Sequence, residues 1–272
     1  QSRYGPAAPL KNILNILDEG RTFAVIAKPC DIGAIKNLER IDVRVKQQIP
    51  YTLTMFCGGL PSLRLPMGML RHFDIHVDEV KQFRWRGEGW PGPTHIETYD
   101  GRIFNLTYEQ SYFSDNVSWT YDSQFRCKIC PDAIGELADI VCPDGWIMEN
   151  GRPIYREAPG VNIIISRTPR GDDLLQQAQS SGAVILKSFN EDELMTMHAD
   201  HIPRKIGWPA RFLGAKLGGA SVTKVENLRK VSAIFCCGPI FFLKTMMKTY
   251  WRIIKGNNFE VSFRNQHQKK YH

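Results

Sequence analysis

Hydrophobic positions in the first sixty residues alternate between helical spacing and short continuous runs. The first helix is predicted from apolar residues at every third or fourth position: Leu10, Ile13, Leu14 and Leu17. Gly20 follows at the place of a helix C-cap, and Asp31 is placed to cap a second helix. Apolar runs at residues 22–27 and 51–56 predict buried strands. Helices and strands in alternation predict an α/β fold.

The pattern changes near residue 80, where polar and apolar residues alternate. Three segments show this alternation: residues 80–86, 94–99 and 102–106. Asp100 and Gly101 together are a strong signal for a hairpin turn. Trp90, in a loop rich in glycine and proline, either closes a core or contacts a cofactor. We predict a small antiparallel β insertion within residues 80–120.

The α/β pattern returns after residue 130. It predicts helices at residues 132–139 and 171–182, and strands at residues 138–141, 161–166 and 183–186. The sequence beyond residue 190 is helical in pattern. We therefore predict a mixed sheet with flanking helices in an α/β domain at residues 1–195, a helical C-terminal extension at 196–256, and a flexible tail at 257–272.

Composition and charge argue against several classes of protein. Hydrophobic residues make up 43% and charged residues 23%, without a biased tract, which is typical of a globular chain. The net charge of +7 is modest and the basic residues are scattered, so nucleic acid is a poor partner. An anionic cofactor or an acidic electron-transfer protein fits this charge better.

The cysteines and the apolar stretches indicate the cellular compartment and any contact with a membrane. Seven widely spaced cysteines and the absence of a signal peptide at Gln1 favour a reducing cytoplasm over secretion. The most apolar stretch, residues 231–243, is too short to span a bilayer. We interpret the following segment as an amphipathic helix that covers the core. Contact with a membrane surface or an oligomer partner through residues 231–255 is the alternative.

Four cysteines have the placement of metal ligands. Cys127 and Cys130 form a Cys-x-x-Cys motif, whereas Cys30 and Cys57 each follow a strand-like run, where open α/β sheets bind ligands. Thiolates from three loops suit an iron–sulfur cluster. Zinc is the alternative, but structural zinc usually uses two compact knuckles, and here the intervals are 27, 70 and 3 residues. We therefore predict a redox protein, and expect Cys142 and the Cys236–Cys237 pair to be buried thiols.

A second candidate site is the loop of residues 167–171, between a predicted strand and a predicted helix. Arg167 and the backbone amides after Thr168 can bind a phosphate, although a solvated turn is the commoner meaning of such a loop. A single cluster passes one electron at a time, so two-electron chemistry needs a flavin beside it. No complete flavin or nucleotide fingerprint is visible in the sequence.

Several segments together resemble the coenzyme F420 hydrogenase/dehydrogenase beta-subunit family. They are residues 28–35, 56–62, 127–132, 136–140 and 165–171, and the resemblance covers about residues 1–195. Residues 86–92 are similar to the branch of 7-hydroxymethyl chlorophyll a reductase and ferredoxin-dependent divinyl reductases. The resemblance implies an oxidoreductase that exchanges hydride with F420, or that reduces a small conjugated substrate with electrons from ferredoxin or another electron-transfer protein.

The resemblance also implies a set of cofactors and residues. It implies a 4Fe-4S cluster beside FAD, with Cys30, Cys57, Cys127 and Cys130 as the metal ligands. Ser2, Tyr4 and Pro6 match a short segment of the flavin pocket, and Asp31 and Asp139 lie next to the cluster-binding segments. Members of the family carry an upstream segment for the flavin, so we expect the N-terminal part of the family to be missing from this chain.

Two other functions stay open at this point. One is a non-catalytic electron-relay subunit that holds a cluster and docks on a larger redox complex. The other is a zinc-stabilised binding module without redox chemistry. No nucleophile with its base stands out in the sequence, so it identifies neither catalytic residues nor the substrate.

Overall fold

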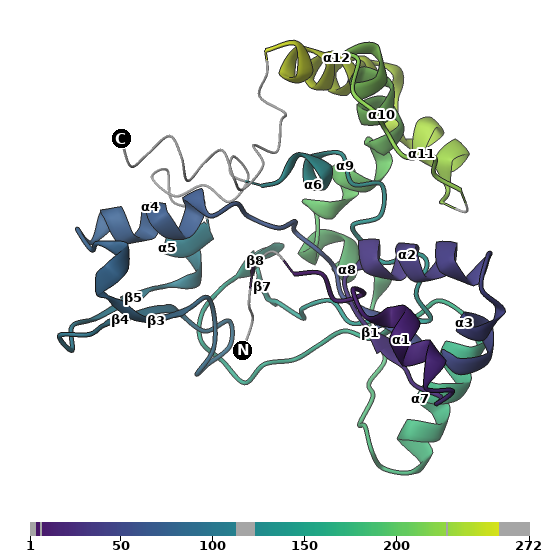
Figure 1. Ribbon diagram of the computed structural model, residues 1–272, viewed down its shortest axis with the longest axis horizontal. Helices are drawn as coiled ribbons and strands as arrows, with labels where there is room; N and C mark the ends of the chain where they lie inside the picture. The colour runs from purple at the N-terminus through teal and green to yellow at the C-terminus, as the bar shows by residue number, and fades with distance from the viewer. Residues whose placement is uncertain (1–3, 6, 113–122, 227, 256–272) are drawn as a thin grey trace. The chain divides into compact units, whose positions relative to one another are not determined.

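The computed structural model describes residues 4–5, 7–112, 123–226 and 228–255 (Figure 1). The chain forms two compact units. The first comprises Gln1–Ser123 and Ile134–Ala199, and the second comprises Gln124–Ala133 and Asp200–His272. The segment with Cys127 and Cys130 therefore belongs to the same unit as the C-terminal helices.

The main sheet of the first unit has four short strands in the order β1-β2-β6-β9. Their bounds are Val25–Ile26 for β1, Thr52–Thr54 for β2, Ile140–Val141 for β6 and Ile165–Ser166 for β9. The strands β1, β2 and β6 pair in parallel, and β9 runs antiparallel to β6. The predicted mixed sheet is confirmed, with strands shorter than the apolar runs that signalled them.

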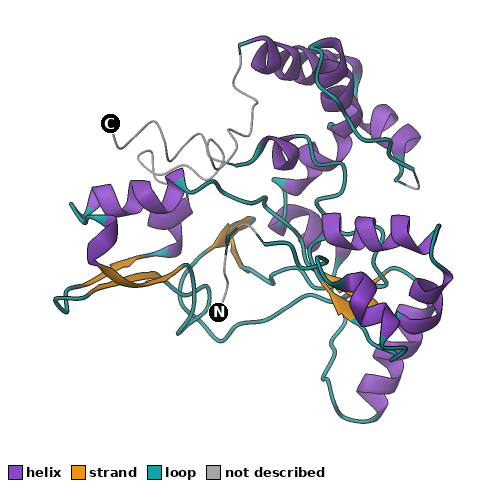
Figure 2. Cartoon of the chain, viewed as in Figure 1, coloured by secondary structure: helices purple, strands orange, loops and turns teal. Residues whose placement is uncertain are grey.

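Helices flank this sheet in the first unit (Figure 2). They are α1 (Ile13–Asp18), α2 (Pro29–Glu39), α3 (Val43–Gln48) and α7 (Pro169–Ser180), whereas α8 (Glu191–Met197) packs on Trp146 in a separate apolar cluster of the same unit. Apolar side chains of the helices and of the sheet form one core, which includes Leu17, Ile32, Ile35, Val45, Ala138 and Val141. Burial of these side chains is the main term that holds the helices on the sheet.

Two local expectations are wrong. Residues 132–139 form turns rather than a helix, because Gly135 has a φ of 68° and packs so tightly on Thr54 that a side chain would clash there. Residues 183–186 form no strand, and Ile185 in this segment is 91% exposed. The segment instead turns back on α7 through a bond from the Ala183 amide to the Ala178 carbonyl, at 2.9 Å.

An antiparallel sheet of three strands forms the predicted insertion. The strands are β3 (Val80–Arg84), β4 (Thr94–Thr98) and β5 (Ile103–Leu106), in the order β3-β4-β5. The helices α4 (Arg64–His72) and α5 (Tyr108–Tyr112) and the 3₁₀ turn η1 (Val77–Glu79) accompany it, and β7 (Ile147–Glu149) pairs with β8 (Arg152–Ile154) elsewhere in the unit. The insertion has its own core, which includes Leu65, Met69, Trp85 and Ile96. Residues 113–120 of the predicted insertion lie outside the described residues.

The second unit is helical, as predicted for the C-terminal part. It contains α6 (Phe125–Lys128), α9 (His201–Ile206), α10 (Trp208–Leu217), α11 (Lys230–Cys237) and α12 (Pro239–Ile254). Gly214 and Gly218 let α10 pack closely on Met246 and Ile253 of α12, where a side chain would have no room. Residues 257–272, predicted as a tail, lie outside the described part.

No single helix in the described ranges is long and apolar enough to cross a membrane. The helices α11 and α12 meet the criteria of length and composition only when taken together, and they are bent by 106° at the break between them.

The carboxylate of Asp139 joins the sheet to α7. One of its oxygens accepts hydrogen bonds from the Thr52 amide at 2.9 Å and the Thr52 hydroxyl at 2.8 Å. The other accepts from the Thr168 hydroxyl at 2.8 Å and from Arg170 Nη2 at 3.1 Å. Thr168 Oγ1 in turn caps α7 by accepting from the Gly171 amide at 3.2 Å.

These contacts change the acidity of Asp139. Burial acts to raise the pKa of this carboxyl, but hydrogen bonds from Thr168 and Thr52 and the charge of Arg170 outweigh burial, so the pKa is lowered. A carboxyl whose pKa is lower in the folded state stabilises the fold above its unfolded pKa. That contribution is lost as the pH falls through the folded pKa.

Asp139→Asn should therefore destabilise the first unit in a pH-dependent way. We expect a loss of about 2 kcal/mol in the free energy of unfolding near neutral pH, because a neutral amide replaces the charged acceptor of several buried hydrogen bonds. The difference from wild type should shrink in acid, because the wild-type carboxyl is then protonated as well. Denaturant unfolding at both pH values measures this, with exposed Asp173→Asn on α7 as the control. An equal loss at both pH values would contradict the account.

Candidate metal centre

Cys30 and Cys57 lie beyond the carboxyl ends of neighbouring parallel strands in the first unit. Cys30 follows β1 and stands in the first turn of α2, and Cys57 follows β2. Pro29 begins α2 and Lys28 is its N-cap residue, so the prediction that Asp31 caps this helix is wrong. Asp31 lies within the first turn and pairs with Lys28 Nζ at 2.7 Å. The structure thus brings these two predicted ligands together.

The electrostatics of Cys30 reflect these neighbours. The residue is exposed, but its sulfur is partly desolvated, and this desolvation is the largest effect that raises the pKa of the thiol. The charges of Asp31 and Cys57 raise the pKa further, whereas the charge of Lys28 lowers it. Without a metal, the protein therefore favours the thiol of Cys30 over the thiolate. A bound metal supplies the charge that stabilises a thiolate.

Cys142 lies at the same edge of the sheet. It directly follows β6, the third parallel strand, and its amide donates to the Thr54 carbonyl at 2.8 Å. Burial raises the pKa of this thiol. Three adjacent parallel strands are thus each followed by a cysteine. Cys142 therefore has a position similar to those of the predicted ligands Cys30 and Cys57, and it is a matched control for them.

Cys127 and Cys130 form a tight turn in the second unit. The single-turn helix α6 contains Cys127, and the Cys130 amide donates to the Cys127 carbonyl at 3.3 Å. Two cations of α9 hold this turn by its carbonyls. Arg204 Nη2 donates to Cys127 O at 3.4 Å, and Lys205 Nζ donates to Pro131 O at 3.2 Å. The four predicted ligands therefore come as two pairs, one in each unit.

A third cation, Arg211 of α10, lies near Cys130. Its guanidinium donates to the carbonyls of Pro203, at 3.4 Å, and of Arg204, both within α9. Its buried Nε has no hydrogen-bond partner among the described residues. Burial and the charge of Arg204 lower the pKa of Arg211 to about 10, while Cys130 acts to raise it. The guanidinium is thus a buried positive charge beside a predicted ligand.

The loop that begins at Arg167 is held internally. Arg167 Nη2 donates to the Ile134 carbonyl at 3.2 Å, and its amide donates to the Asp139 carbonyl at 2.9 Å. Thr168 caps α7 and bonds to Asp139. These contacts give Arg167, Thr168 and Asp139 structural roles, and a cofactor contact by any of them stays a prediction.

Tyr4 stands in a cluster of aromatic rings around a buried arginine. Its ring packs edge-on against Trp85 and Tyr112, with centroids 5.7 and 6.1 Å apart. The guanidinium of Arg86 lies 3.5 Å from Tyr4 Oη and 5.1 Å from the centroid of the Tyr108 ring. Ser2 and Pro6, the other predicted flavin contacts, lie outside the described residues.

Trp90 packs in the same region of the first unit. Its ring stacks on Trp146 with centroids 5.1 Å apart, and Gly160 fits against it where a side chain would clash. Of the two interpretations of Trp90, packing in a core is what the structure shows. Burial, followed by the charge of Tyr4, raises the pKa values of the neighbouring Tyr108 and Tyr112, so both stay protonated at neutral pH.

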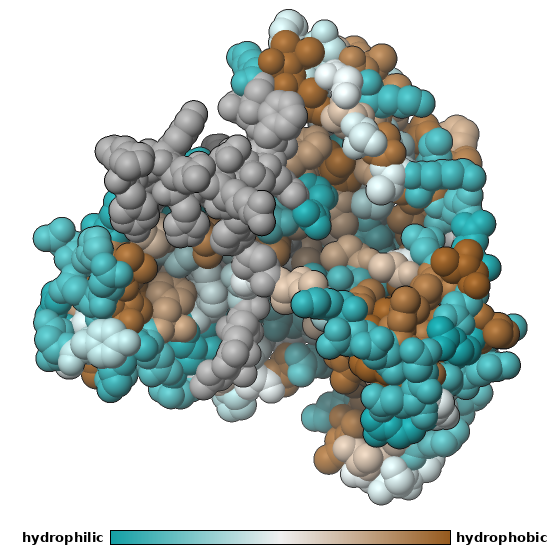
Figure 3. All heavy atoms as spheres, in the orientation of Figure 1, coloured by the Kyte–Doolittle hydropathy of each residue, from teal (hydrophilic) through white to brown (hydrophobic). Residues whose placement is uncertain are grey.

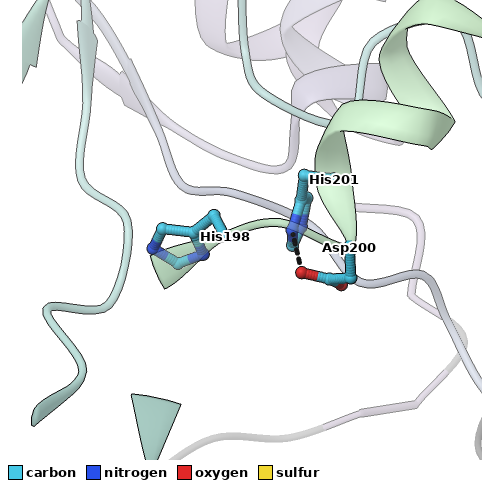
Figure 4. A group of neighbouring side chains, drawn as sticks. All are labelled: His198, Asp200 and His201. Carbon is cyan, nitrogen blue, oxygen red and sulfur yellow. Dashed lines mark hydrogen bonds and ion pairs between the residues drawn. The ribbon is translucent and has the colours of Figure 1, made fainter. Parts of the chain in front are cut away.

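The structure contains two buried histidines, His198 and His201, that the sequence patterns did not identify as buried. Figure 4 shows His198, Asp200 and His201, where the chain passes from the first unit to the second. His198 Nε2 bonds to the Asp144 carbonyl at 2.8 Å, and its ring packs on Phe56, next to Cys57. His201 Nδ1 bonds to Asp200 at 3.0 Å. Both histidines are buried through contacts distant in sequence, so helical spacing could not reveal this.

Comparison with known families identifies the chain. The family model that describes the C terminus of the coenzyme F420 hydrogenase/dehydrogenase beta subunit matches residues 20–192. This match covers more than half of the 272 residues. The chain belongs to this family. The predicted family is thus confirmed, and the hydrogenases and dehydrogenases in its name support the redox class predicted from the cysteines.

Individual relatives within this family match the chain over similar lengths. Coenzyme F420 hydrogenase subunit beta of Methanothermobacter thermautotrophicus is 22% identical over 195 residues, which are 66% of this chain and 59% of the relative. A chain of the F420-reducing [NiFe] hydrogenase complex from Methanosarcina barkeri is similar with a TM-score of 0.45 and 17% identity, over 66% of this chain and 57% of that one. This chain thus spans less than two thirds of the length of each.

Some features of the candidate site in this F420 hydrogenase/dehydrogenase family member lie inside the matched region, and others lie outside it. It contains the four predicted ligands Cys30, Cys57, Cys127 and Cys130. It ends at residue 192, before α9 and α10, so the cations that contact the Cys-x-x-Cys turn lie beyond the matched region. The contacts that Arg204 and Lys205 make with this turn therefore come from the C-terminal part of this chain.

The charges around Cys30 give a direct test of its surroundings. Asp31→Asn should lower the pKa of the Cys30 thiol in metal-free protein, because a neighbouring negative charge is removed. Lys28→Met should raise it, because a positive charge is removed. The pH dependence of Cys30 alkylation, followed by mass spectrometry, measures both shifts, with exposed Cys236 as the internal control. Shifts in the same direction would contradict the assigned electrostatics.

Proposed function

We propose that this chain is an iron–sulfur flavoprotein oxidoreductase subunit in which four cysteines hold a 4Fe-4S cluster. The observation that carries the proposal is the placement of the thiols. Cys30 and Cys57 follow neighbouring parallel strands, Cys127 and Cys130 share one turn, and all four lie in the family-matched region. Thiolate ligands from several loops, with small residues beside them, suit such a cluster.

The charges near the cysteines support a cluster with a net negative charge. Four thiolates around four irons and four sulfides leave an anionic centre, which nearby cations stabilise. Lys28 acts on Cys30, while Arg204 and Lys205 hold the turn of Cys127. Arg211 adds a buried charge near Cys130. Each pair of proposed ligands therefore has cations beside it.

The proposal includes FAD, an electron partner and a substrate class. The cluster would supply single electrons, and FAD would pair two of them for hydride exchange with F420 or with a small conjugated substrate. Tyr4, among the aromatic rings around Arg86, supports a flat aromatic ligand in the first unit. The net charge of +7 supports an acidic electron donor such as ferredoxin, in a cytoplasmic setting.

Replacement of Cys57 tests the ligand assignment. Cys57→Ser should lower the iron content per folded chain to less than half of the wild-type value, because an alcohol is a poor replacement for a thiolate ligand. Cys142→Ser is the matched control, because Cys142 follows the adjacent parallel strand and is not a proposed ligand. Iron analysis of anaerobically purified proteins measures both. A loss of iron in Cys142→Ser, or none in Cys57→Ser, would contradict the assignment.

Replacement of Arg211 tests the role of the buried charge. Arg211→Met should make the cluster harder to reduce, because a nearby positive charge stabilises the reduced, more negative form. A tenfold change in the reduction equilibrium corresponds to about 59 mV for one electron. A redox titration followed by electron paramagnetic resonance measures the potential, with exposed Lys216→Met on the same helix as the control.

Two further observations separate charge from folding in this experiment. Arg211→Lys should keep a potential near the wild-type value because it keeps the charge, even if the hydrogen bonds to the Pro203 and Arg204 carbonyls are weakened. Iron content and thermal melting establish that each variant is loaded and folded. An unchanged potential in fully loaded Arg211→Met would count against an electrostatic role for this residue.

A further inference from the structure

The helix α12 has two apolar faces, of which only one is used in packing. One face, with Met246, Thr249 and Ile253, lies against α10, where Gly214 and Gly218 permit close approach. A second set of large apolar side chains on α12 is exposed: Ile240, Leu243, Met247, Trp251 and Ile254. We name these five residues the α12 stripe. A helix that only covered a core would not need it.

The α12 stripe is continuous along the helix. At about 100° per residue, its five positions fall within an arc of about 80°, on a different side of the helix from the face that packs on α10. Trp251, at one edge of this arc, is 51% exposed. The helix is 16 residues long, so the stripe extends over about 20 Å of its length. Figure 3 shows hydrophobic residues at the surface where α12 lies in Figure 1.

Positive charges accompany the stripe without any negative charge. The segment from Lys230 to Lys255 contains five lysines and arginines and no aspartate or glutamate: Lys230, Lys244, Lys248, Arg252 and Lys255. Lys244, Lys248 and Lys255 are exposed and flank one edge of the α12 stripe. The preceding helix α11 adds exposed apolar residues, with Phe235 81% exposed. Cys236 of α11 is also exposed, so the prediction that both cysteines of this pair are buried is wrong.

We propose that the α12 stripe and its flanking lysines bind the surface of an anionic lipid bilayer. Aromatic and aliphatic side chains on one face, beside lysines and without acidic residues, are typical of helices that lie in the membrane interface. Exposed tryptophan also favours that interface. Each lysine near an anionic surface adds to the attraction, and the total falls with increasing salt.

Charge favours this occupant over a second copy of the chain. In an antiparallel pair of copies joined through the stripe, the lysines of both copies would lie along the same side of the interface, and like charges at an interface oppose association. An anionic lipid surface instead offers both an apolar layer and opposite charge. This inference depends on the described second unit alone and is independent of the proposed cluster.

Flotation of the full chain with lipid vesicles tests the proposal. The chain should float with vesicles of phosphatidylcholine mixed with phosphatidylglycerol, remain unbound with phosphatidylcholine alone, and be released by added salt. Two variants target the two components. Leu243→Glu with Trp251→Glu places two charges within the stripe, and Lys244→Glu with Lys248→Glu reverses the charge beside it.

Matched controls make the same charge changes elsewhere. Ile185→Glu with Tyr99→Glu alters exposed apolar residues of the first unit, and Lys46→Glu with Lys187→Glu alters exposed lysines there. Both α12 variants should bind anionic vesicles at least about tenfold more weakly than wild type, and both controls within about twofold of it. Circular dichroism establishes that each variant is folded.

Three results would overturn the proposal. The first is failure of the wild-type chain to float with anionic vesicles. The second is equal binding of folded α12 variants and wild type. The third is a wild-type oligomer that does not bind vesicles and that Leu243→Glu with Trp251→Glu dissociates in sedimentation velocity. That third result would assign the stripe to a second copy of the chain.

Discussion

The buried carboxylate of Asp139 is the interaction on which the first unit depends most. It accepts bonds from Thr52 of β2, from the cap residue of α7 and from Arg170, and the Asp139 carbonyl accepts from the Arg167 amide. A buried charge is tolerated only where such donors surround it. By joining the first residue of β2, the segment before β6 and the start of α7, this carboxylate holds the amino-terminal ends of the parallel strands, at the edge of the sheet opposite the one beyond which Cys57 lies.

The order of the strands explains why cysteines far apart in sequence become neighbours. Because β1 and β2 are parallel neighbours, Cys30 and Cys57 follow strands that end at the same edge, although 27 residues separate them. The second pair depends on a different device, a single turn held by cations from α9. Sheet order determines the first pair, and electrostatic contacts of the C-terminal helices support the second.

Sequence patterns predicted the parts of the structure that arise from local and repeating features. The antiparallel insertion followed from alternation and the turn at Gly101, and α7 (Pro169–Ser180) followed from the amphipathic pattern that predicted a helix at residues 171–182. The turns at residues 132–139 could not be predicted, because helical spacing does not reveal the close packing of Gly135 on Thr54. The burial of His198 and the cation Arg211 near Cys130 likewise arise from long-range packing.

The central claim is that the cysteines hold an iron–sulfur cluster, and cofactor analysis of the anaerobically purified chain tests it most directly. The account predicts a coloured protein with about four irons and matching sulfide per chain, whose visible absorption bleaches on reduction. Bound flavin would support an enzyme over a relay subunit. A colourless protein with zinc in place of iron would contradict the account and leave a zinc-stabilised fold.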